Sequence, residues 1–162
     1  MACLRSAIRS WFKFCRLAWS ERWLLFQALF LLTVTAVSLR LLGFRRWQAV
    51  LARFTPARGV SASRPADALV QQGCAAARIM KMAAARGPCR TNCLQQSLVL
   101  WWLLRRRGID ADLRIGVRKE AGQFEAHAWV ELAGVVLSDD MDVYQRFTPF
   151  NRIIRPSWWG FS

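Results

Sequence analysis

Histidine and acidic residues are scarce in this chain of 162 residues. There is one histidine, His127, so a histidine-rich metal site is excluded and any catalysis that needs an imidazole must use this residue. The five cysteines are odd in number and follow no regular spacing. This pattern argues against a small secreted scaffold held together by disulfides.

Asp and Glu number 10 against 24 Lys and Arg, which gives a formal net charge of +14. Such an excess predicts an anionic partner, which could be an acidic peptide, a nucleic acid or lipid headgroups. The basic residues are spread through the whole chain, whereas a nucleic-acid tail would concentrate them, so no nucleic-acid partner is expected. Hydrophobic residues make up 54%, which excludes a disordered chain and suffices for one core.

The N-terminal third is basic at first and then apolar. On a helix, Arg5, Arg9, Lys13 and Arg16 would form one stripe, which is either a solvated face or an interfacial helix that meets anionic lipid. Together with the apolar segment that follows, this stripe allows membrane-surface association through residues 1–46.

Residues 23–39 carry no charge, and three interpretations compete for them. They form a buried core helix, a membrane anchor at the lower limit of spanning length, or the apolar part of a signal peptide with residues 36–38 as its cleavage site. Pro, Gly and Ser then mark a loop. The predicted organisation is an N-terminal helical segment, a linker and a C-terminal core, at residues 1–54, 55–65 and 66–162.

The C-terminal part begins with helical periodicity over residues 66–86, and a second helix follows after Gly87 and a proline. Thr91 or Asn92 is a suitable N-cap for this second helix, so Cys93 is predicted in its first turn. Free backbone N–H groups at that position stabilise a thiolate and could hold an oxyanion. The alternative is that Cys93 is a small buried apolar residue.

Beyond Gly108 the hydrophobic period changes to two, over residues 113–118 and 124–131, and a short apolar run follows at 135–137. Short turns separate these runs, so the sequence predicts a three-stranded antiparallel meander and an α+β fold. With a turn centred on residues 133–134, His127 faces position 140 on the next strand. His127 is therefore predicted beside Asp139 and Asp140.

A thiol, an imidazole and a carboxylate thus occur in the order Cys93, His127, Asp139. In a cysteine nucleophile site the imidazole takes the thiol proton and later protonates the leaving amine, while the carboxylate orients the imidazole. A zinc site built from Cys89, Cys93 and His127 is the alternative, but it lacks a clear fourth ligand. No metal or cofactor is expected.

Three blocks carry a family resemblance: Asn92-Cys93-Leu94 with Ser97-Leu98, the stretch from Leu103-Leu-Arg-Arg-Arg-Gly108 to Lys119, and Ala126-His-Ala-Trp-Val-Glu131 followed by Ser138-Asp139. Together they resemble the transglutaminase-like cysteine proteases of lasso-peptide biosynthesis, over residues 66–140. The resemblance implies a transglutaminase-like or papain-like core, in which a helix bearing the nucleophile packs on a small antiparallel sheet. It assigns Cys93 as nucleophile, His127 as base and Asp139 as orienting acid, with Asp140 as the neighbouring alternative.

The same resemblance implies an activity and its partners. The expected reaction is removal of the leader from a ribosomally made precursor peptide, in the cytoplasm, after which an ATP-dependent lasso cyclase closes a macrolactam. The N-terminal third lacks strand alternation and does not resemble a leader-recognition element. The chain therefore resembles the stand-alone peptidase of split systems, which needs a separate leader-recognition protein.

Several residues keep two interpretations. Trp129 and Glu131 are candidate substrate contacts, or a core residue and a surface strand residue. Trp158, Trp159 and Phe161 are expected to form a docking or lid segment. Two other functions remain open, namely a basic membrane-associated adaptor without catalysis and a transglutaminase-type acyltransferase that uses the same three residues.

Overall fold

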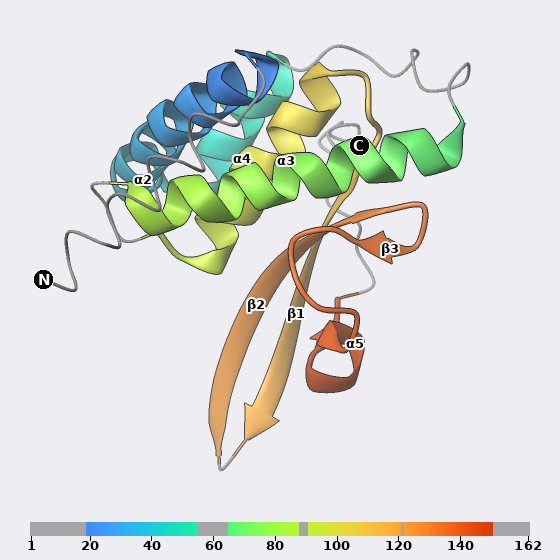
Figure 1. The fold of residues 1–162 in the computed structure, drawn as a ribbon. Helices are drawn as coiled ribbons and strands as arrows, with labels where there is room; N and C mark the ends of the chain where they lie inside the picture. The colour runs from blue at the N-terminus through green and yellow to red at the C-terminus, as the bar shows by residue number, and fades with distance from the viewer. Residues whose placement is uncertain (1–18, 55–64, 88–90, 121, 151–162) are drawn as a thin grey trace, which may run out of the picture.

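In the computed structural model, helices gather over one part of a small antiparallel sheet, and a long hairpin of that sheet extends away from them (Figure 1). The structure describes residues 19–54, 65–87, 91–120 and 122–150. The elements in chain order are α2 (Trp19–Arg53), α3 (Ala66–Arg86), α4 (Cys93–Arg106), β1 (Asp112–Glu120), β2 (Gln123–Leu132), β3 (Val135–Val136), α5 (Val143–Arg146) and β4 (Thr148–Pro149). The predicted α+β class is confirmed.

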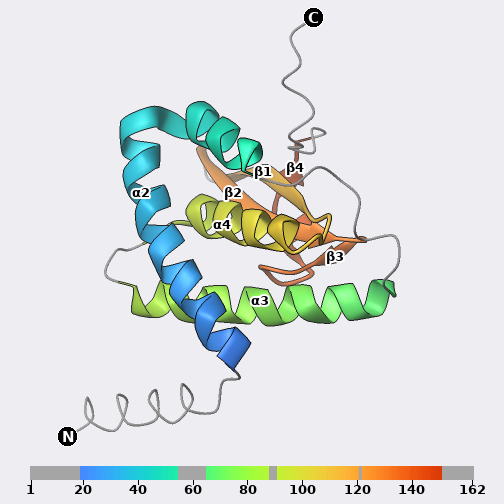
Figure 2. The same cartoon turned by 90° about the horizontal axis from the view of Figure 1, so that it is seen from above.

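Helix α2 is long, bends sharply and contributes one face to the core (Figure 2). The bend lies at Gly43, whose φ of 74° and ψ of 169° interrupt the helix. Across the bend the Trp47 indole donates a buried hydrogen bond of 3.2 Å to the Thr35 hydroxyl. Ala28 and Leu32 are buried in the same cluster as α4, whereas Phe30 is exposed.

By length and composition α2 could cross a membrane, and 33% of its most apolar window is buried inside the structure. The segment therefore packs on the protein with one face, as the core-helix interpretation expects, and leaves its other face uncovered. The predicted basic stripe at 1–16, the linker at 55–64 and the C-terminal aromatic segment at 158–161 lie outside the described residues. The proposed division of the chain into segments stays a prediction.

Helix α4 is the central element, because α2, α3 and the sheet all contact it. Its residues from Ser97 to Leu104 are all buried, and Trp101 has no exposed surface. The Trp102 indole donates a buried hydrogen bond of 3.0 Å to the backbone oxygen of Leu51 in α2. A helix that is apolar on nearly all sides requires such cover on several sides.

The described sheet has the order β3-β2-β1-β4. The predicted three-stranded meander is present, with β1 and β2 in the register that pairs Gly116 with His127. Ala133 and Gly134 both have positive φ, 49° and 80°, as a two-residue hairpin turn requires. The short strand β4, which pairs Thr148 with Val117, was not predicted.

Strand β2 is covered on both faces where it passes under α4. Ala128, Trp129 and Val130 are consecutive and all buried. One face joins the main core, while Trp129 forms a second cluster with Val136, Val143 and Phe147. Trp129 is therefore a core residue, one of its two predicted alternatives, because α5 and the chain after it cover the second face of the sheet.

Candidate active site

A pocket of about 230 Å³ lies where α3, the start of α4, strand β2 and the chain after β3 meet. Cys93, His127 and Asp139 all line it, so the structure brings together the three residues that the sequence singled out. The other lining residues are Ala77, Met80, Lys81, Gln96, Ser97, Leu100, Ala128 and Ser138. The helices thus contribute apolar and polar side chains to the pocket, while His127 from β2 and Asp139 from the chain after β3 contribute its ionisable groups opposite Cys93.

Cys93 is a partly exposed free thiol and the first residue of α4. The helix starts there because Asn92 and Gln95 form a capping box, in which each side chain accepts a hydrogen bond from the other residue's backbone N–H, at 2.9 and 3.1 Å. The backbone N–H of Gln96 bonds to the Asn92 carbonyl. The predicted N-cap is confirmed at Asn92. It fixes the start of α4, so that the Cys93 thiol lies in the first turn of the helix.

His127 lies in the middle of β2 and bonds through Nε2 to Oδ2 of Asp139. This contact leaves Nδ1 as the ring nitrogen that can exchange a proton with another group. Phe147 stacks on the imidazole, with ring centroids 4.9 Å apart and an interplanar angle of 26°. The ring is therefore held on one face by an aromatic side chain and at one edge by a carboxylate.

Asp139 reaches His127 because the chain leaves the sheet after β3. The Leu137 N–H still donates to the Val130 carbonyl at 2.8 Å, but the Val130 N–H donates to the hydroxyl oxygen of Ser138 at 2.9 Å. A side chain thus replaces the next ladder acceptor, and Asp139 turns toward the imidazole. Asp140 contributes its backbone N–H, which donates to Asp139 Oδ1 at 2.8 Å.

The surroundings of Asp139 favour its ionised form. Partial burial raises the pKa of Asp139, but the Asp140 N–H, the His127 ring and the Arg146 guanidinium together lower it below the ordinary value. Arg146 lies 3.3 Å from Asp139 Oδ1 and also pairs with Asp142. The carboxylate can therefore support a positive charge on His127 while it stays deprotonated.

Sequence reasoning missed Ser97 as a residue of this pocket. Its buried hydroxyl donates a hydrogen bond of 2.8 Å to the carbonyl of Ala128, the residue after His127. This bond ties the helix that carries Cys93 to the strand that carries His127. Ser97 lies four residues after Cys93, hence on the same helix face, and this spacing was the available signal.

The two predicted substrate contacts, Trp129 and Glu131, do not line the pocket. Trp129 has no exposed surface, so it could contact a substrate only after a rearrangement. Glu131 accepts hydrogen bonds from Arg114, at 3.1 Å, and from the Tyr144 hydroxyl. Burial, and then the hydrogen bond to Glu131, raise the pKa of Tyr144.

The alternative zinc site of Cys89, Cys93 and His127 is only partly covered by the described residues. Within the described ranges no group of three or more His, Cys, Asp and Glu side chains could hold a metal ion. Cys89 lies outside these ranges. Cys74 is partly buried against the hydrophobic core.

Parts of this sequence are similar to known proteins. The chain is 44% identical over 50 residues to the Microcin J25-processing protein McjB of Escherichia coli, a stretch that covers 31% of this chain and 23% of that protein. No solved structure matches the chain. A family model described as the transglutaminase-like superfamily matches residues 38–152, from the second half of α2 to beyond β4. This match spans well over half of the sequence, and the chain therefore belongs to the transglutaminase-like superfamily.

Proposed function

We propose that the protein is a cysteine peptidase that removes the leader from a lasso-peptide precursor. The observation that carries the proposal is the shared pocket of Cys93 and the bonded pair of His127 and Asp139. The relative McjB is named as a processing protein of a microcin, which supports a peptide precursor as substrate.

The chemistry follows from the atoms around the pocket. His127 Nδ1 takes the proton of the Cys93 thiol, and the sulfur attacks the scissile carbonyl carbon to give a tetrahedral intermediate. His127 then protonates the leaving amine as the C–N bond breaks, which leaves a thioester on Cys93. Water, deprotonated by the same imidazole, hydrolyses the thioester and restores the thiol.

The start of α4 offers a place for the oxyanion. The backbone N–H groups of Gln95 and Gln96 bond to Asn92. Those of Cys93 and Leu94 have no acceptor among the residues that the structure describes. Two donors beside the nucleophile are what a developing oxyanion needs, and removal of one such donor costs about 10²–10³-fold in rate.

The proposed partners are the precursor peptide, a separate leader-recognition protein that delivers it and the lasso cyclase that acts afterwards. A short precursor gene and an asparagine-synthetase-like gene beside this one would identify the substrate. The test is to incubate the protein with that precursor and the recognition protein and to follow leader release by mass spectrometry. C93A and H127A should abolish release and keep the wild-type circular dichroism spectrum.

Retained release by C93A would disprove the peptidase proposal. A transglutaminase-type acyltransferase uses the same acyl-enzyme but passes it to an amine, so biotin-cadaverine is added to the same reaction. A biotinylated product in place of the free acid would favour acyl transfer over hydrolysis. The adaptor alternative predicts normal function of C93A, and this assay separates it from both enzymes.

A further inference from the structure

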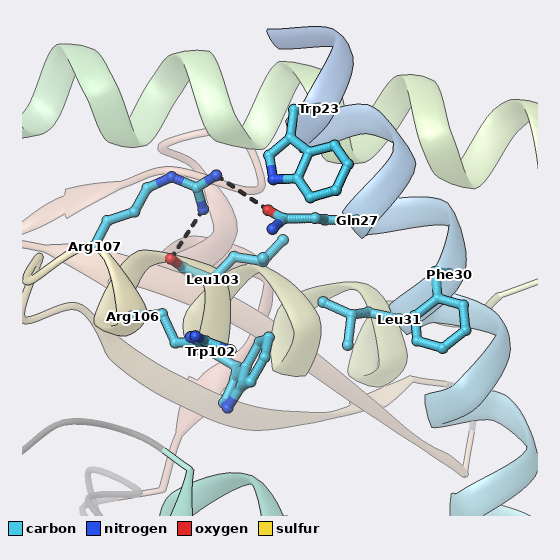
Figure 3. Close-up of a pocket in the computed structure, with 8 residues that line it drawn as sticks. All are labelled: Trp23, Gln27, Phe30, Leu31, Trp102, Leu103, Arg106 and Arg107. Carbon is cyan, nitrogen blue, oxygen red and sulfur yellow. Dashed lines mark hydrogen bonds between the residues drawn. The ribbon is translucent and has the colours of Figure 1, made fainter. Parts of the chain in front are cut away.

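A second and larger pocket, of about 420 Å³, lies between α2 and the C-terminal half of α4 (Figure 3). Its lining residues are Trp23, Gln27, Phe30, Leu31, Trp102, Leu103, Arg106 and Arg107. From α2 they follow the spacing i, i+4, i+7 and i+8, which is one helix face. Cys93 and the groups around it line the other pocket, so this groove is separate from the candidate active site.

The walls of this groove are apolar and in part uncovered. Trp23 is 62% exposed and Phe30 is 69% exposed, although burial of such large aromatic side chains lowers the free energy. Trp102 and Leu103 form the buried floor. A side chain that fills the groove would therefore remove apolar surface from water on both helices.

The rim of the groove carries the positive charge of two arginine side chains. Arg107 donates hydrogen bonds to the Leu103 carbonyl, at 3.1 Å, and to the Gln27 amide oxygen, at 3.4 Å, and both acceptors are neutral. Arg106 lies over the Trp102 ring at 5.0 Å. Neither guanidinium has a carboxylate partner in the described part of the chain, and none of the lining residues is acidic.

The two arginine side chains at this rim are close enough to repel each other. Desolvation, and then repulsion by Arg106, lower the pKa of Arg107 from its ordinary value. A carboxylate placed between the two guanidinium groups would relieve this repulsion and form charge-assisted hydrogen bonds.

We propose that the groove between α2 and α4 is a docking site for an acidic peptide segment of a partner protein. One aromatic or leucine side chain of this segment fills the space above Trp102 and Leu103, and a neighbouring carboxylate binds Arg106 and Arg107. A peptide is favoured over a bilayer because the apolar surface is a concave groove with charge on one rim, whereas a bilayer presents a flat surface. The proposal does not depend on catalysis at Cys93.

The test uses the full-length protein and a synthetic peptide array. Each peptide carries one Trp, Phe or Leu, and its neighbours are varied among Glu, Gln and Lys. Wild-type protein should bind the Glu peptides at least about ten-fold more strongly than the matched Gln peptides. Equal binding of Glu and Gln peptides would overturn the proposal.

Charge-reversal variants separate this groove from the general basic character of the chain. R106E/R107E should lose the Glu preference and gain a preference for Lys. R40E/R53E changes the net charge equally at two exposed positions of α2 that do not line the groove, and should keep the wild-type preference. The same loss in both variants would show a non-specific charge effect and would contradict the proposal.

The apolar half of the site needs its own pair of variants. W23A removes one wall and should weaken binding of every array member about ten-fold or more. F124A removes another exposed aromatic, from the tip of the β1–β2 hairpin, and should have no effect. Flotation with phosphatidylcholine vesicles, with and without phosphatidylglycerol, completes the test. Binding to anionic vesicles without a Glu preference on the array would assign the surface to lipid instead.

Discussion

His127 presents Nε2 to Asp139, and this choice of ring nitrogen decides what the imidazole can do. With Nε2 occupied, Nδ1 alone is left to exchange a proton with a thiol. In the proposed mechanism, Asp139 therefore orients His127 and supports its positive charge. Asp140, one residue later, provides only a backbone N–H to this arrangement.

Replacement of the two neighbouring carboxylates should give different results. D139A removes the group that orients His127 and should lower kcat for leader release by about 10²–10⁴-fold with little change in KM. D140A keeps its backbone N–H and should retain near-normal activity. Steady-state kinetics on both variants measures this, and a larger loss in D140A would contradict the assignment.

The same carboxylate predicts how stability depends on pH. Because the pKa of Asp139 is lowered in the folded protein, its ionised form stabilises the fold. The contribution is complete above the ordinary Asp pKa of about 3.9 and is lost as the pH falls through the lower folded value. The difference in the free energy of unfolding between wild type and D139N, from urea titrations, should therefore shrink below about pH 4. D140N is the control and should track wild type across this range.

At the residue scale the sequence could identify the chemical groups but not all their neighbours. A single histidine and a cysteine behind a good N-cap were visible, and both line the pocket. The spacing of Ser97 from Cys93 indicates a shared helix face, but its hydrogen bond to Ala128 depends on how closely α4 approaches the sheet, which the sequence does not indicate. Trp129 is buried because α5 packs on its face of the sheet, and the sequence around Trp129 does not indicate that α5 packs there.

Among the elements, the start of α4 matters most for the site, because Cys93 is its first residue. N92A removes the cap and should lower the free energy of unfolding by about 1 kcal/mol. N92D keeps an acceptor for the Gln95 N–H and should recover most of the loss. Urea titration measures both, and leader release should fall in N92A beyond what its stability explains, since the thiol is no longer held.

The hairpins show why some elements were predictable and others were not. The alternation in β1 and β2 and the turn at Ala133 and Gly134 are local signals, and the structure has both. Strand β4 has two residues, one of them a proline, and pairs with residues far away in the sequence. Gly116 allows this pairing, because a Cβ there would lie 2.9 Å from the Thr148 carbonyl oxygen.

For the whole molecule, α2 is part of the core that supports the site. A28D places a charge at a position with no exposed surface and should lower the free energy of unfolding by more than about 3 kcal/mol. F26D, two residues earlier and 60% exposed, should change it by less than about 0.5 kcal/mol. Thermal melts by circular dichroism compare the two, and equal losses would show that α2 does not pack as described.

The tight connection between β2 and β3 also limits which parts of the chain can change in length during evolution. Asp139 follows His127 by twelve positions in the sequence. The two-residue turn at Ala133 and Gly134 keeps the connection between them short. One inserted residue there would shift the β2–β3 register by one residue and displace the carboxylate from the imidazole. The far end of the β1–β2 hairpin is exposed and remote from the pocket. Related chains should therefore vary in length at that tip while the count from imidazole to carboxylate stays constant.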